Sequence, residues 1–213
     1  MINIDNSYDL LVYLKNQDLI DENLEYWWPN NNKFEILIGA ILTQNTKWLN
    51  VEKSLENLRE EELLSLEALS TAHLETLILA ITPSGFKNQK SVRLIQLAKN
   101  IIEEYDTFEN FCKGTNREWL LKQKGIGPET ADAILCYSCR QDYMVVDSYT
   151  NRLVKRFGYE FESYDELQAW CEYGINENYD KIAKLYGYEI SINKLYARFH
   201  GKIVEFMKRN RKG

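Results

Sequence analysis

Proline and glycine are scarce in this 213-residue chain, which contains 3 and 10 of them. So few turn-forming residues exclude long linkers and low-complexity segments, and an apolar content of 45% supplies a buried core. No run approaches the ~20 apolar residues of a membrane span, and the first residues carry acids where an export signal needs basic ones. We therefore expect a soluble protein with no membrane partner, located in the cytoplasm and nucleoid-associated.

Cysteine and histidine are also scarce. In a chain without an export signal, the thiols of Cys112, Cys136, Cys139 and Cys171 are expected to be reduced. Cys136 and Cys139 have the spacing of a metal or redox pair. A structural zinc site needs four ligands, however, and the chain has only 2 histidines to add to these two cysteines. We predict no metal site.

The net charge of −6 argues at first against a nucleic-acid partner, because nonspecific binding comes from Lys and Arg that neutralise phosphates. By segment, however, the charge is −5 over residues 1–35, −1 over 36–157, −6 over 158–193 and +6 over 194–213. The basic C-terminal run and the acid-free patch formed by Lys87, Lys90, Arg93 and Lys99 are therefore candidate phosphate-binding surfaces. The alternative is that both are solvated helix faces.

Apolar residues recur at helical spacing almost throughout, and no alternating strand pattern is present. Two apolar stripes, around residues 34–42 and 92–102, predict buried helices. Further helices are predicted over Asp5–Lys15, Asn50–Arg59, Leu74–Ala80, Arg117–Lys122, Pro128–Cys139, Ser148–Arg156, Tyr164–Tyr173 and Asp180–Arg209. The fold class is therefore all-α.

A glycine-rich turn separates two of these helices. Gly125 and Gly127 allow a positive φ and a close backbone approach. Pro128 is at the first position of the next helix, where the missing N–H costs no hydrogen bond. This pattern predicts a helix-hairpin-helix, whose backbone N–H groups and helix dipole form a phosphate cradle that needs no lysine. A tight structural turn is the alternative for this motif alone.

Asp147 follows Gly127 by twenty residues, after the apolar run 144–146 and before a helix. Taken alone, such an Asp is an N-cap. With the hairpin, the sequence resembles the helix-hairpin-helix DNA glycosylases of the endonuclease III superfamily, whose signature is L-x-G-x-G-x-x-T-A followed by an essential Asp in V-D-[ST]. Seven positions carry the match: Gly125, Gly127, Thr130, Ala131, Val146, Asp147 and Ser148. The likeness extends upstream through 41–46 and 85–90, and covers roughly residues 30–160.

The resemblance implies two helical subdomains that flank a cleft within a single glycosylase unit, 1–213. Residues of about 30–105 and 106–160 are expected to carry the pocket and wedge helices and the hairpin with Asp147, and the N-terminal segment is expected to pack with residues 161–213. Bifunctional members carry a lysine two residues after the second glycine of the hairpin, and this lysine forms a Schiff base. This sequence has Glu129 at that position. The four-cysteine iron–sulfur motif is absent, because only Cys171 lies beyond Asp147. We therefore expect a monofunctional enzyme without cofactor.

Roles for single residues follow from the same resemblance. Asp147 is the expected catalytic carboxylate, which stabilises an oxocarbenium-like sugar and activates water. Gln44 aligns with a glutamine that enters the duplex and Phe86 with an apolar wedge, with a capping glutamine and a core phenylalanine as alternatives. The expected DNA-binding residues are Gln44, Phe86, Lys87, Gly125, Gly127 and Thr130.

The aromatic run Tyr26-Trp27-Trp28-Pro29 suggests which base is removed. Indole faces stack bases and attract cationic ones, and N3-methylated adenine is a cation with a labile bond. The motif resembles the 3-methyladenine DNA glycosylase branch, with a base pocket of Trp27, Trp28, Pro29, Trp48 and Lys202. Packing of Trp27 and Trp28 in the core is the alternative.

Lys202 is also a candidate for carbamylation by carbon dioxide, or a simple phosphate contact. The expected partner is double-stranded DNA with alkylated bases, bound by a monomer. A glycosylase for another damaged or mismatched base, a noncatalytic DNA-binding protein and a helical interaction domain remain alternatives.

Overall fold

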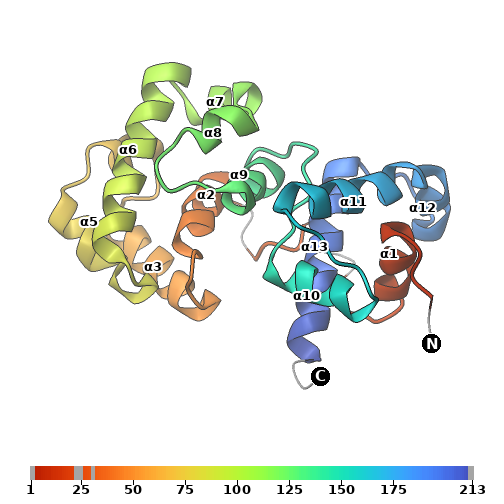
Figure 1. Ribbon diagram of the computed structural model, residues 1–213. Coiled ribbons are helices and arrows are strands. Elements are labelled where there is room, and N and C mark those ends of the chain that lie inside the picture. Colours follow the sequence, from red (N-terminus) through yellow and green to blue (C-terminus); the bar gives the residue numbers. More distant parts are fainter. Residues whose placement is uncertain (1–2, 22–25, 30–31, 211–213) are drawn as a thin grey trace. The chain divides into compact units, whose positions relative to one another are not determined.

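The computed structural model describes residues 3–21, 26–29 and 32–210 (Figure 1). These residues form helices joined by turns and contain no β-strand, so the all-α prediction is confirmed. None of the described helices is long and apolar enough to cross a bilayer.

The chain divides into two compact units, which we call the central unit (residues 30–140) and the terminal unit (residues 1–29 and 141–213). The division after residue 140 assigns Asp147 to the terminal unit and the hairpin to the central unit. The segment 106–160, predicted from the sequence as one part, is therefore shared between the two units.

Buried apolar side chains explain the helices of the central unit. Helix α2 (Lys33–Leu42) is buried from Phe34 to Leu42, as expected for a helix that is apolar on all sides. The long helix α6 (Lys87–Tyr105) packs against α4 and α7, although Val92 of its predicted stripe is 53% exposed. The other helical elements are α3 (Trp48–Glu60), α4 (Leu66–Ser70), α5 (Leu74–Ala80), η1 (Thr82–Ser84), α7 (Phe108–Gly114), α8 (Arg117–Leu121), α9 (Pro128–Ala133) and the π-helical η2 (Ile134–Ser138).

The predicted helix-hairpin-helix is formed by α8 and α9. Gly125 has φ +84°, and a Cβ there would lie 2.4 Å from Cζ of Arg93 on α6. Gly127 has φ −95°, so of the two glycines that allow a positive φ only Gly125 adopts one. Arg117 Nε donates to the fully buried Asp132 carboxylate at 2.9 Å and thereby joins α8 to α9.

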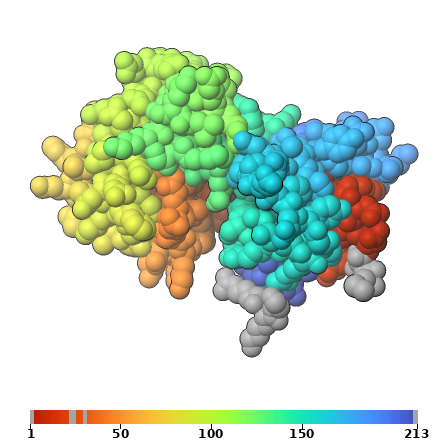
Figure 2. All heavy atoms as spheres, in the orientation of Figure 1, coloured from red at the N-terminus to blue at the C-terminus, as the bar shows by residue number. Residues whose placement is uncertain are grey.

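The terminal unit combines both ends of the described chain. Its helices are α1 (Ser7–Lys15), α10 (Ser148–Arg156), α11 (Tyr164–Asn176), α12 (Tyr179–Tyr186) and α13 (Ile192–Arg209). Helix α1 packs against α11 and α13, and Figure 2 shows the N-terminal residues (red) against C-terminal ones (blue). At the contact, a Cβ on Gly174 would lie 2.3 Å from Ser7 Oγ, so α1 approaches the α11 backbone directly.

The single helix predicted over residues 180–209 is wrong. Gly187 ends α12 in the left-handed region at φ +75°, and Ser191 caps α13 by accepting a hydrogen bond from the Lys194 N–H. All four cysteines are buried and free of disulfides. The described residues contain no group of three or more His, Cys, Asp or Glu side chains arranged to hold a metal ion.

Candidate active site

The carboxylate of Asp147 is held at the start of α10. Its Oδ1 accepts hydrogen bonds from the N–H of Thr150 at 2.8 Å and from the Thr150 hydroxyl at 3.0 Å. Thr150 Oγ1 in turn accepts from the Asp147 N–H at 3.3 Å, which completes a capping box. Oδ2 takes no part in this cap, so capping occupies only one of the two carboxylate oxygens.

His200 on α13 faces that second oxygen. Its Nε2 lies 3.6 Å from Asp147 Oδ2, and the two side chains are 7% and 15% exposed. Burial alone would raise the pKa of Asp147, but the His200 imidazole and the Thr150 hydrogen bonds together outweigh burial and hold the pKa below its usual value. Asp147 is therefore a negative charge at neutral pH.

An indole ring adjoins this pair. Trp27 meets the His200 ring edge-on at 5.5 Å between centroids, and its Nε1 donates to Glu205 Oε1 at 3.2 Å. A Cβ on Gly201 would lie 2.2 Å from Trp27 Cγ, so the indole rests on the backbone of α13. The neighbouring Trp28 is buried at 8% exposure, as in the core-packing alternative, while Trp27 is partly exposed.

Two basic residues of helix α13 are buried, whereas Arg209 at its end is exposed. Arg198 is fully buried and Lys202 is 1% exposed. Lys208 pairs with Glu205 at 2.9 Å and lies over the Trp27 ring at 5.4 Å. The predicted basic face of the C-terminal run is therefore wrong at Arg198 and Lys202, because both point into the terminal unit.

In the central unit, Gln44 is bound to the hairpin. Its Nε2 donates to the Gly125 carbonyl at 2.9 Å and to the Thr130 hydroxyl at 3.0 Å. The structure thus brings together Gln44 with Gly125 and Thr130, which were selected from two separate sequence motifs. A Cβ on Gly127 would meet nothing within 4 Å, so the space beside this backbone is open.

The predicted wedge is on the surface. Phe86 has a left-handed backbone with φ +47° immediately before α6, and its side chain is 62% exposed. The core alternative for Phe86 is therefore wrong. Lys87 follows as the first residue of α6 and is partly exposed. Trp48, also in the central unit, begins α3 and is partly buried.

Lys90 was predicted to be part of a surface patch of cations, and this prediction is wrong because its side chain is buried. It is 2% exposed, and its amine donates to the carbonyls of Leu42, Gln44 and Ser84 and to the Thr46 hydroxyl, at 2.8–3.0 Å. Burial first, and then the positive charge of Arg93, lower the pKa of Lys90 to about 8.

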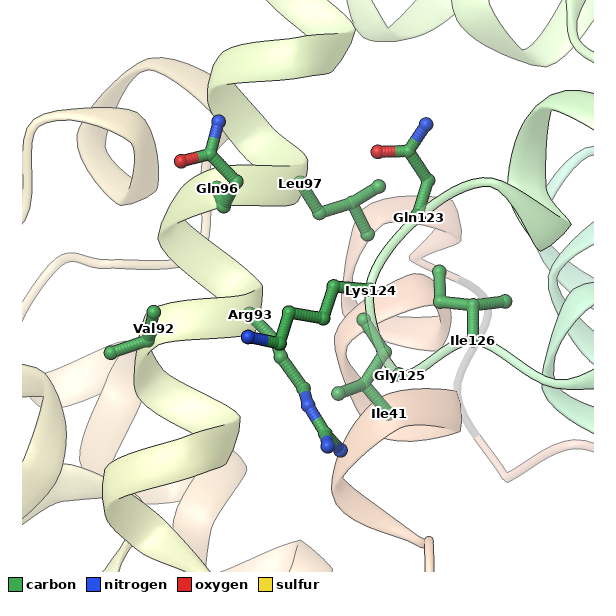
Figure 3. A pocket seen from close by; sticks show the side chains of 9 residues that line it. All are labelled: Ile41, Val92, Arg93, Gln96, Leu97, Gln123, Lys124, Gly125 and Ile126. Atoms are coloured by element: carbon green, nitrogen blue, oxygen red, sulfur yellow. The ribbon is translucent and has the colours of Figure 1, made fainter.

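A cavity of about 250 Å³ lies beside the hairpin (Figure 3). Its wall is apolar at Ile41, Leu97 and Ile126, and it carries two cationic side chains, Arg93 and Lys124. Among the described residues neither cation has a carboxylate partner. The cavity thus places two positive charges next to the hairpin backbone.

Comparison with known protein families shows which family the chain belongs to. Residues 38–174 match the HhH-GPD superfamily of base excision DNA repair proteins. The chain belongs to this superfamily. As an HhH-GPD protein it is a DNA glycosylase that acts in base excision repair through a DNA-binding helix-hairpin-helix.

Relatives of this HhH-GPD protein occur among curated sequences and solved structures. A Methanocaldococcus jannaschii protein, whose name proposes a DNA repair glycosylase, is 35% identical over 86% of this chain and 80% of its own. Helicobacter pylori 3-methyladenine DNA glycosylase (MagIII), whose crystal structure contains 1,N6-ethenoadenine, is 48% identical in sequence to this chain. The two structures superimpose with a TM-score of 0.92, and the match covers 96% of this chain and 98% of that one. An endonuclease III in a trapped covalent DNA complex shares the fold at a TM-score of 0.70 and 19% identity.

Two contacts of the described residues, one in each unit, were not predicted from the sequence. His200 is one of only 2 histidines and stands two positions before Lys202, which was selected, but its contact with Asp147 joins distant segments. Lys90 was grouped with surface cations, because its acceptors are mostly backbone carbonyls that no sequence pattern reveals.

Proposed function

We propose that the protein is a monofunctional DNA glycosylase that excises alkylated purines, 3-methyladenine above all, from duplex DNA. The observation that carries this proposal is the set formed by Asp147, His200 and Trp27, which pairs an ionised carboxylate with an indole ring. The 48% identity to a 3-methyladenine DNA glycosylase supports the same substrate class.

The chemistry assigned to Asp147 follows from its geometry. Hydrolysis of an N-glycosidic bond develops positive charge on the sugar, which a fixed carboxylate stabilises. The cap on Oδ1 fixes the orientation of Asp147, and we assign to Oδ2 the contact with the sugar and with the attacking water. Water adds to C1′, its proton passes to the carboxylate, and the bonding electrons leave with the base. His200 is assigned a positioning role behind Oδ2.

Base recognition is assigned to the aromatic face of Trp27. Lys208 already lies 5.4 Å from the centre of this ring, so its face accepts a cation. An alkylated adenine that carries a positive charge would gain about 0.5–2 kcal/mol from the same interaction. Trp28, Pro29 and Trp48 remain assigned to the pocket on the basis of the sequence.

Two features argue for hydrolysis without strand cleavage or cofactor. Glu129 in the first turn of α9 has no amine to attack C1′, so no Schiff base forms at that position. Beyond Asp147 the sequence has only Cys171, too few thiolates for an iron–sulfur cluster. We also propose that the buried Lys202 carries a carbamate, which adds a negative charge and two acceptors inside the terminal unit.

Products released from alkylated duplex DNA test this function. We expect free 3-methyladenine from the wild type, and strand breaks only after alkali. Asp147→Asn should abolish release while DNA binding persists. Release of a different base would contradict the substrate, breaks before alkali would contradict monofunctional hydrolysis, and an Asp147→Asn variant with full activity would contradict the mechanism.

Four physical measurements test the remaining assignments. Fluorescence titration with 1,N6-ethenoadenine should show binding that Trp27→Ala weakens. Electron density beyond Lys202 Nζ should show the carbamate, and a bare ammonium would refute it. Iron analysis and light scattering should show an iron-free monomer.

A further inference from the structure

Three loops of the central unit are connected through the buried amine of Lys90, two of them directly and the third through Gln44. The Gln loop (residues 43–47) follows α2, the wedge loop (residues 82–86) precedes α6, and the hairpin turn (residues 122–127) joins α8 to α9. Each loop carries a residue assigned above to DNA binding. The three loops are distant in sequence, so something must fix their relative positions.

The amine of Lys90 bonds directly to two of these loops. It contacts the Gln loop at the Gln44 carbonyl (3.0 Å) and the Thr46 hydroxyl (2.9 Å), and the wedge loop at the Ser84 carbonyl (2.9 Å). Thr46 Oγ1 also donates to the Ser84 carbonyl. The ammonium group has three protons and meets four acceptors with Leu42 included, so no donor is left for solvent.

The third loop is reached through Gln44. While the Gln44 carbonyl accepts from Lys90, the side-chain Nε2 of the same residue donates to the hairpin at Gly125 and Thr130. The connection therefore runs from the wedge loop through Lys90 and Gln44 to the hairpin. If the Gln44 side chain enters DNA, its hairpin bonds break, but Lys90 still holds its backbone.

We propose that Lys90 is a positioning residue that fixes the Gln loop and the wedge loop as one rigid unit, so that both enter the duplex together when a base is extruded. An ammonium rather than a neutral side chain suits this position, because charge-assisted hydrogen bonds are stronger than neutral ones and a buried charge requires several partners. A loop displaced by about 1 Å can cost on the order of 10²-fold in rate, so rigidity here bears on function. The inference rests on the proposed DNA-inserting roles of Gln44 and Phe86.

Duplex distortion, measured without catalysis, tests this role. The probe is a DNA duplex with a tetrahydrofuran abasic-site analogue beside 2-aminopurine, whose fluorescence reports unstacking by inserted side chains. At saturating protein we expect Lys90→Met to lose most of the wild-type fluorescence change. Lys53→Met, which replaces an exposed lysine on α3, is the matched control and should retain the change. An unchanged signal in Lys90→Met would overturn the inference.

A mutant cycle separates positioning from general destabilisation. If Lys90 acts by holding both loops, Lys90→Met should add little to the loss already caused by Gln44→Ala and Phe86→Ala together, whereas mere loss of stability would give additive effects. Additive losses would therefore overturn the proposal. If the wild type binds the duplex but Phe86→Ala leaves the signal intact, the proposed wedge has failed instead, and the two failures are distinguishable.

The pH dependence of the wild type gives a test that needs no variant to fold. Because the pKa of Lys90 is about 8, its charge is lost as the pH rises from about 7 to about 9, and the fluorescence change should fall over that range. Arg93 is the charged group that acts on the amine from its own helix, whereas the groups that face it from the Gln loop and the wedge loop are uncharged. A signal that stays constant to about pH 9 would contradict the role of the ammonium.

Discussion

Replacing Asp147 by Asn and by Ala separates its two roles. Asn retains an oxygen that accepts from the Thr150 N–H, so the cap of α10 persists while the charge is lost. Ala loses the cap as well, which costs about 1 kcal/mol. For a chain of this size that amounts to about 2–4 °C in Tm, so Asp147→Ala should melt about 2–4 °C below Asp147→Asn.

Activity should respond differently from stability. Both variants lack the carboxylate, and single-turnover excision should slow on the order of 10²–10³-fold or more in each. The matched control is Ser163→Ala, which removes another N-cap of the terminal unit, where Ser163 Oγ accepts from the Glu166 N–H at 3.2 Å. It should lower Tm by about as much as the loss of the Asp147 cap and leave excision unchanged.

The pH dependence of stability gives a further check on the same residue. Because the folded-state pKa of Asp147 is lowered, its ionised form stabilises the fold above the unfolded-state pKa, and this contribution is lost as the pH falls through the folded-state pKa. The Tm difference between wild type and Asp147→Asn should therefore narrow in acid. Excision by Asp147→Asn near the wild-type rate would refute the reasoning, because the residue would then be only a helix cap.

Three other changes should have separable effects. Gly201→Ala places a Cβ 2.2 Å from Trp27 Cγ, so it should displace the ring and weaken 1,N6-ethenoadenine binding in a fluorescence titration; unchanged affinity would argue against Trp27 as the base-binding face. Phe86→Ala should shift unfolding free energy by less than about 0.5 kcal/mol, because the side chain is 62% exposed, while slowing single-turnover excision; equal rates would remove Phe86 from the wedge role. Arg93→Ala should reduce the slope of log affinity against log salt by about one unit, whereas an unchanged slope would show that this guanidinium contacts no phosphate.

Local patterns in the sequence predicted most of the fold. The helix over Ser148–Arg156 was predicted with its observed bounds, because Asp147 is a strong cap and the apolar spacing that follows is clear. The hairpin was predicted from Gly125, Gly127 and Pro128. The break between α12 and α13 was missed, since the glycine at 187 and the serine at 191 lie inside otherwise helical spacing.

Candidate site residues could be selected from the sequence only where a residue stands in a local motif. Asp147 and Phe86 stand in such motifs. His200 and Lys90 act through contacts with segments far away in sequence, 53 residues to Asp147 and 48 to Leu42. A charge count treats Lys90, Arg198 and Lys202 as surface cations, although all three are buried, because burial depends on tertiary packing.

The terminal unit is discontinuous in the chain, and this has a consequence for biosynthesis. Residues 30–140 form one uninterrupted compact unit, whereas helix α1 must wait for α11 and α13 before it can pack. Because chains emerge from the ribosome N-terminus first and units fold as wholes, the central unit is expected to fold while the terminal one is still being made. His200, which faces the Asp147 carboxylate, lies on α13, the last helix described, so this contact is completed last. A nascent or truncated chain would then have the helix-hairpin-helix before the contact between Asp147 and His200 can form, and under the proposed function translation arrest before α13 should leave a DNA-binding fragment that removes no base.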